Sequence, residues 1–169
     1  TGTATKTEPK SEESSKGGAV AEVTGDTPTK DQVNAMSSKQ IVENIKVGWN
    51  LGNSLDSHDT NSSDTETGWG NPKTTQQMID TVKAAGFNAV RIPVTWGEHM
   101  SADGTIDAAW MSRVKEVVDY AYNDGLYVIL NVHHDDALWL VPTKDKLESD
   151  KATLTAIWKQ ICATFQDYD

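Results

Sequence analysis

The chain has 169 residues and carries 15 Lys and Arg against 25 Asp and Glu, which gives a net charge of −10. This negative charge argues against binding to nucleic acid or to anionic membrane surfaces, because both would repel it, and it favours an uncharged partner. The single cysteine, Cys162, excludes an internal disulfide and a multi-cysteine metal site. No apolar run approaches the roughly 20 residues that a bilayer span requires, so we expect no membrane insertion.

The first part of the chain, residues 1–35, differs in composition from the rest. It holds no aromatic residue and is rich in Thr, Ser, Gly, Lys and Glu. Such a segment buries too little apolar surface to offset the entropy lost on ordering, so we predict a disordered linker or tail. It is either a terminus without a role or a spacer to a further module or a cell-surface anchor upstream. We expect the folded domain to cover residues 36–169.

Helix and strand signals alternate from Met36 onward. Ser37 and Gln40 have the spacing of a capping box ahead of a short helix. A first strand that runs into a loop is predicted over 47–55, and Thr74 is expected to cap the next helix, which Gly86 ends.

A second strand is predicted over 88–94, and Asp107 is expected to cap the helix that ends near Gly125. Residues 126–132 are almost continuously apolar, as in a strand buried on both faces. The last helix carries apolar residues at helical spacing, namely Leu154, Ile157, Trp158, Ile161 and Phe165. Because helices separate successive strands, the sequence predicts an α/β fold with a parallel sheet.

Polar and aromatic residues cluster where each predicted strand ends. The clusters are Asn50, Asn53, Ser54 and Asp56; Arg91, Trp96, Glu98 and His99; and Asn131, His133, His134, Asp135 and Asp136. Open parallel sheets and (β/α)8 barrels both build their sites at the carboxyl ends of strands. We therefore predict one shared site, with ordinary polar loop residues as the alternative.

Charged and titratable residues in these clusters suggest specific roles. Arg91 lies in an apolar strand, where a guanidinium needs a partner, so it holds either a carboxylate in the site or a structural ion pair. His133 and His134 invite a metal interpretation, but neighbours on a strand point to opposite faces, so we predict no metal site. Neutral imidazoles that hydrogen-bond a polar ligand fit better, although a structural role for His134 is nearly as good an interpretation.

Six tryptophans are many for a chain of this length. Trp69, Trp96 and Trp139 fall in loops after strands, where indole faces suit the CH faces of sugar rings, or else they simply cover the end of the fold. Trp110 and Trp158 lie on helix faces and are expected in the core. We also expect Cys162 to be packed or inert, since nothing near it in the sequence suggests thiolate activation.

Four segments together resemble a known family. They are Val47-Gly-Trp-Asn-Leu-Gly-Asn-Ser-Leu-Asp56, Glu66-Thr-Gly-Trp-Gly-Asn-Pro72, Gly86-Phe-Asn-Ala-Val-Arg-Ile-Pro-Val-Thr-Trp96 and Tyr127-Val-Ile-Leu-Asn-Val-His-His-Asp135. In order and spacing they are similar to the N-terminal half of a glycoside hydrolase family 5 cellulase. The resemblance implies a (β/α)8 TIM barrel, of which this chain covers about the first three βα units. It also implies retaining, endo-acting hydrolysis of β-1,4-glucan without a cofactor.

The same resemblance assigns roles to individual residues. It implies that Arg91 hydrogen-bonds the nucleophilic glutamate and that His133 contacts the sugar beside the scissile bond. His134, Asn53 and Trp69 match positions that line the substrate cleft, and we add Trp96 to this substrate-binding set from its place after the second strand.

The chain departs from the family in one respect. It contains no Asn-Glu-Pro segment, and the family's acid/base and nucleophile are glutamates at the ends of strands four and seven. We therefore expect both to lie beyond Asp169, in a secreted or cell-surface protein whose barrel needs about 250 residues. Alternatives are a relative acting on xyloglucan, mixed-linkage glucan or mannan, a non-catalytic carbohydrate-binding relative, and a metal-dependent hydrolase built on the histidines.

Overall fold

The structure is a computed structural model that describes residues 30–168. The predicted linker, residues 1–35, lies mostly outside this range, but its last residues form helix α1 (Lys30–Asn34). Helical structure therefore begins earlier than we predicted. Asp31 in the first turn favours the helix because a carboxylate there interacts well with the helix dipole.

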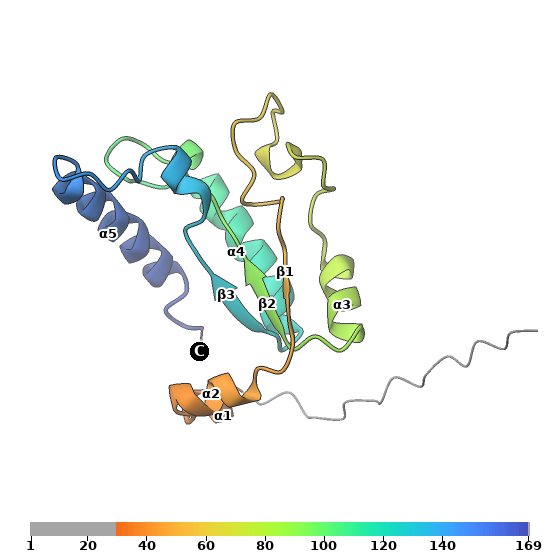
Figure 1. The fold of residues 1–169 in the computed structure, drawn as a ribbon. Helices are drawn as coiled ribbons and strands as arrows, with labels where there is room; N and C mark the ends of the chain where they lie inside the picture. Colours follow the sequence, from red (N-terminus) through yellow and green to blue (C-terminus); the bar gives the residue numbers. More distant parts are fainter. Residues whose placement is uncertain (1–29, 169) are drawn as a thin grey trace, which may run out of the picture.

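Three short parallel strands form one sheet in the order β1-β2-β3 (Figure 1). They are β1 (Gly48–Asn50), β2 (Ala89–Ile92) and β3 (Tyr127–Leu130). This arrangement confirms the parallel α/β fold. Segment 47–55 is a strand that runs into a loop, as predicted: β1 ends at Asn50, and Asn53 in the loop adopts a left-handed conformation with φ of 59°.

Four further α-helices and three 3₁₀ helices complete the described chain. They are α2 (Ser38–Asn44), η1 (Thr65–Thr67), α3 (Gln76–Ala84), η2 (Gly97–His99), α4 (Ala108–Asn123), η3 (His134–Ala137) and α5 (Leu147–Thr164). In Figure 1, α4 lies behind the sheet, α3 and α5 flank it, and α1 and α2 lie at the end where the strands begin. Within residues 30–168, no helix is long and apolar enough to cross a membrane.

The helix boundaries follow local signals, with one correction. Ser37 and Gln40 form the predicted capping box, and the Asp107 carboxylate accepts the backbone N–H groups that open α4. We predicted Thr74 as the N-cap of α3, but the N-cap is Thr75. The backbone N–H of Thr74 instead donates to the buried carboxylate of Glu66, 2.8 Å away, which keeps Thr74 outside the helix.

The core lies between the sheet and the helices behind it. Val90 and Ile92 of β2 are fully buried, as are Val114 and Val117 of α4 and Ile79 of α3. Their side chains recur at strand and helix periods, which turns one face of each element toward the same interior. This packing holds β2 against α4 and fixes where the loop after β2 begins.

The opposite face of the sheet is open, and here two predictions were wrong. Residues of β3 are only half-buried, and Ile129 is 48% exposed although we expected burial on both faces. Trp158 of α5 is 37% exposed although we expected it in the core. Cys162, which we expected to be packed or inert, is exposed and so is not packed. The reason is that no further layer covers these side chains within residues 30–168.

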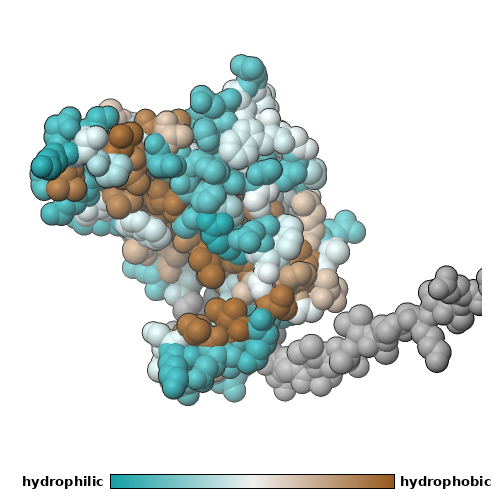
Figure 2. Space-filling model, viewed as in Figure 1, coloured by the Kyte–Doolittle hydropathy of each residue, from teal (hydrophilic) through white to brown (hydrophobic). Residues whose placement is uncertain are grey.

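An apolar groove of about 900 Å³ runs along this open face. Its walls come from α1 and α2 on one side, β3 in the middle and α5 on the other. Figure 2 shows apolar residues around the hollow that separates α1 and α2 from the rest of the chain. We refer to this feature as the apolar groove.

Candidate functional site

The loops that follow β1, β2 and β3 gather at one end of the sheet, opposite α1 and α2 (Figure 1). Arg91 of β2 is half-buried there and lies between two neighbours. Its Nη2 lies 3.0 Å from Nδ1 of His133, and its Nη1 donates to Oδ1 of Asn50 at 3.4 Å. No carboxylate pairs with Arg91 among residues 30–168, so the predicted glutamate partner stays a prediction.

The hydrogen bonds around His133 fix its tautomer. Nδ1 lies 3.0 Å from Nη2 of Arg91 and 3.2 Å from Nδ2 of Asn131. The guanidinium of Arg91 can only donate hydrogen bonds. Asn131 also presents a donor here, its Nδ2, because its Oδ1 accepts the backbone N–H of Val94. Nδ1 must therefore be the acceptor, and the ring proton sits on Nε2.

The protonation state of His133 follows from the same surroundings. Burial lowers the pKa of His133, and electrostatic interaction with His134 and with the guanidinium of Arg91 lowers it further. The imidazole is therefore neutral around neutral pH. Its Nε2–H is a directed donor with no partner among the described residues, which suits a hydroxyl of a polar ligand.

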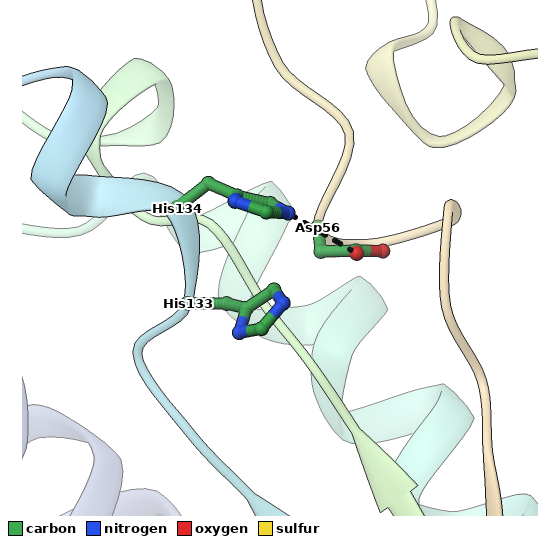
Figure 3. Close-up of side chains that lie close together, drawn as sticks. All are labelled: Asp56, His133 and His134. Atoms are coloured by element: carbon green, nitrogen blue, oxygen red, sulfur yellow. Dashed lines mark ion pairs between the residues drawn. The ribbon is translucent and has the colours of Figure 1, made fainter.

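Asp56 joins the two histidines in one cluster (Figure 3). It is 3% exposed, and its Oδ2 lies 3.7 Å from Nε2 of His134. The two imidazole rings are 4.2 Å apart between centroids. Our argument that neighbouring histidines point apart was wrong here, because β3 ends at Leu130 and strand alternation no longer applies to His133 and His134.

This cluster offers three ligand atoms within 4.8 Å of one another, from Asp56, His133 and His134. A metal on Nε2 of His133 would require the proton to move to Nδ1, where Arg91 and Asn131 already donate. The tautomer therefore disfavours metal binding, and our prediction of a metal-free site keeps its physical basis without the alternation argument.

Three aromatic rings pack together beside this cluster. Trp69 lies 5.1 Å from the ring of His58 and 5.4 Å from that of His134, and His58 and His134 are 5.3 Å apart, all between centroids. The indole N–H of Trp69 donates to the backbone carbonyl of His58 at 3.0 Å. Since Trp69 remains 39% exposed, part of its indole ring is open to a ligand. Asn53 is exposed in the same loop.

Trp96 is the predicted site residue that the structure removes from the surface. Its side chain is completely buried, and its indole N–H donates to the carbonyl of Asn131 at 3.1 Å. An indole whose N–H finds an internal acceptor can be buried whole, so its ring has no face left for a sugar.

Asp135 is structural as well. It is fully buried and accepts the backbone N–H groups of Trp96 and Gly97 and the indole N–H of Trp139. Its carboxylate is thus occupied in joining the loops after β2 and β3. The polar residues after the strands therefore divide into those that hold loops together and those that face the site.

Sequence reasoning gave no separate role to three residues of the site: Asp56, His58 and Asn131. Asp56 and Asn131 were part of the strand-end clusters, but nothing in the sequence showed that one would face His134 and the other would orient His133. The only signal for His58 was its position two residues after Asp56.

Comparison with known proteins adds to this geometry. A family profile described as cellulase (glycosyl hydrolase family 5) matches residues 54–169. The chain belongs to glycosyl hydrolase family 5. It is 50% identical over 139 residues to endoglucanase A of Clostridium longisporum and 47% identical over 139 residues to endoglucanase A of Ruminococcus albus. These alignments cover 79% and 81% of the chain but only 27% and 38% of the relatives.

Solved structures of family 5 enzymes match the fold. A broad specificity endoglucanase from Ruminococcus flavefaciens aligns with a TM-score of 0.74 and 49% identity, over 79% of this chain and 39% of that one. A xyloglucan-specific endo-β-1,4-glucanase from a metagenomic library aligns with a TM-score of 0.74 and 52% identity, over 78% and 40%. The three βα units thus form part of a family 5 α/β barrel, and the chain spans less than half of these relatives.

Proposed function

We propose that the protein to which this chain belongs is a retaining endo-β-1,4-glucanase, and that this chain supplies part of its substrate-binding cleft. The observation that carries the proposal is the oriented His133, whose Nδ1 is held by Arg91, whose Nε2–H has no partner among the described residues, and whose ring packs on His134, which in turn contacts Trp69. A neutral donor beside open aromatic faces suits an uncharged polysaccharide, in agreement with the acidic charge of the chain.

Each residue then has a defined task. His133 donates from Nε2 to a hydroxyl of the sugar beside the scissile bond, and Trp69 stacks on a sugar ring farther along the cleft. His134 and Asn53 line the cleft between them. Arg91 donates from Nη2 to Nδ1 of His133 and from Nη1 to Asn50. In the whole enzyme we expect the guanidinium also to hydrogen-bond the nucleophilic glutamate.

The bond cleavage itself belongs to two glutamates that this chain does not contain. In a retaining enzyme they lie about 5–5.5 Å apart, and one attacks the anomeric carbon while the other protonates the leaving oxygen and then activates water. Because its substrate is a polymer too large to enter a cell, we place the enzyme outside the cell or on its surface. The segment that we predicted as a linker, residues 1–35, would then join the enzyme to a further module or a cell-surface anchor.

The test uses the full-length protein on carboxymethylcellulose, mixed-linkage glucan, xyloglucan and mannan. We expect reducing sugar from the β-1,4-glucans, and product of retained anomeric configuration by NMR. His133→Ala is expected to lower kcat/KM about two- to tenfold, the value of one neutral hydrogen bond to the substrate. Lys159→Ala, an exposed substitution on α5 away from this cluster, is the control.

Three results would contradict the proposal. They are a preference for mannan, inversion of configuration, and binding of glucan by a folded protein that releases no sugar. The last would identify a non-catalytic relative.

Xyloglucan is the second candidate substrate. Its support is the 52% identity to a xyloglucan-specific enzyme over most of this chain. Activity on xyloglucan at least tenfold above that on unbranched glucan would favour it.

A further inference from the structure

Glu66 and Arg113 form a buried ion pair between the loop after β1 and helix α4. Nε and Nη2 of Arg113 donate to the two carboxylate oxygens of Glu66, at 2.8 and 2.9 Å. Glu66 is 1% exposed. This fork of two parallel hydrogen bonds fixes the direction of both side chains, not only their separation.

The pair also closes the base of a loop. Oε1 of Glu66 accepts the backbone N–H of Thr74 at 2.8 Å, and Nη2 of Arg113 donates to the backbone carbonyl of Thr74 at 2.7 Å. Residues 66 and 74, eight positions apart in sequence, are thereby joined to one guanidinium. The segment between them is a closed loop that carries Trp69 and whose two ends are held by Arg113 of α4.

Two hydrogen bonds hold the far side of this loop. The indole N–H of Trp69 donates to the carbonyl of His58, and Nδ2 of Asn71 donates to the carbonyl of Gly52 at 2.9 Å. Both acceptors belong to the loop that also carries Asp56. The position of Trp69 relative to His134 therefore depends on these two contacts and on Arg113, which holds the two ends of the loop at Glu66 and Thr74.

Both members of the pair keep their charges. Burial opposes ionisation of Glu66, but the hydrogen bonds from Arg113 and Thr74 outweigh it and lower the pKa of the carboxyl. The hydrogen bond to Glu66 raises the pKa of Arg113 despite burial. A buried ion pair is weak evidence for stability, because desolvation offsets the attraction, and its role here is better sought in orientation.

We propose that Glu66 and Arg113 are positioning residues that hold Trp69 where it stacks on a sugar ring of the substrate. This inference rests on the proposed function, because it names the residues that build one sugar-binding position of that cleft. Neither residue touches substrate. Their effect on binding runs through Trp69, and they contribute nothing directly to bond cleavage.

The experiment measures KM and kcat of the full-length enzyme on soluble β-glucan. Glu66→Gln and Arg113→Lys weaken the fork while keeping size or charge, and each is expected to raise KM about tenfold with kcat within about twofold, as for lost binding that is equal in ground and transition states. Asp119→Asn is the matched control, since it removes a carboxylate from Lys115 on the same helix without touching the loop. We expect it to leave KM unchanged.

A double-mutant cycle separates positioning from general damage. In a Trp69→Ala background, Glu66→Gln is expected to change KM by less than about twofold, because the residue it positions is gone. An unchanged KM in folded Glu66→Gln and Arg113→Lys variants would overturn the inference. So would a KM rise that persists without Trp69, or failure of both variants to fold, which would mark a purely structural pair. Failure of the proposed function looks different, because then the wild-type enzyme releases no sugar.

Discussion

The loop end of this part of the barrel and its apolar groove differ. Among the described residues, two buried carboxylates at the loop end have hydrogen-bond partners, whereas apolar side chains in the groove are left uncovered. At the loop end, the buried carboxylates of Asp135 and Glu66 each accept several hydrogen bonds. In the apolar groove, Ile129 and Trp158 remain exposed. The geometry of the site is therefore built from contacts within this chain, whereas the groove calls for additional protein to cover it.

The largest effect expected from this contrast concerns the 169-residue chain alone. We predict that it releases no sugar from β-glucan, because the three strand ends that it holds offer no matched pair of catalytic carboxylates. We also predict oligomers or aggregates, because an open apolar groove and an edge of β3 that is unpaired within residues 30–168 both promote association. Sedimentation, thermal unfolding and reducing-sugar release test this. A monomer with a sharp melting transition would contradict the prediction of association. Glu98 is a carboxylate in one of the strand-end clusters, and sugar release that depends on it would contradict the prediction of inactivity.

Removing a charge from the loop end is expected to have the next largest effect. In the full-length protein, Arg113→Ala leaves Glu66 buried without its partner, and we expect a loss of about 3–5 kcal/mol in the free energy of unfolding. Urea denaturation measures it. Lys115→Ala, which breaks a partly exposed pair with Asp119 on the same helix, is expected to cost about 1 kcal/mol or less. Equal losses for the two variants would show that burial of the pair is unimportant.

A third substitution sharpens the comparison within the site. Arg91→Ala in the full-length enzyme is expected to lower kcat about a hundredfold or more, because the nucleophile loses its charge partner and Nδ1 of His133 loses a donor. Glucan binding should remain largely intact, and Lys159→Ala on α5 serves as the control. Wild-type kcat in a folded Arg91→Ala variant would refute this role.

The smallest expected effect is on the pH dependence of stability. Burial lowers the pKa of His99, which stacks on Trp110 at 3.7 Å, so folded His99 stays neutral when the unfolded chain binds a proton. The contribution of neutral His99 to the free energy of unfolding is complete above about pH 6.5. It is lost as the pH falls, by at most about 1.4 kcal/mol per pH unit. Urea denaturation between pH 7.5 and 5.5 tests this. His99→Phe keeps the stacking and should flatten the dependence, and an unchanged slope would exclude His99.

Local signals in the sequence determined the helices and the parallel order of the strands. The capping box at Ser37, the cap at Asp107 and the glycine stop at Gly86 lie where predicted, because each depends on residues a few positions apart. The family and the region of the site also followed from the sequence, since short motifs at the ends of successive strands carry both. Burial of β3 did not follow, because it depends on what lies across the sheet.

Only the tertiary structure decided where each residue of the site lies and what it contacts. Trp69 and Trp96 have the same side chain and both follow strands, yet one is exposed beside His134 and the other is buried beneath Asn131. The tautomer of His133 depends on Arg91, 42 positions away in sequence. The pairing of Glu66 with Arg113 spans 47 positions. Such contacts form only when the packing of helices against the sheet brings the loops together, so no local pattern in the sequence encodes them.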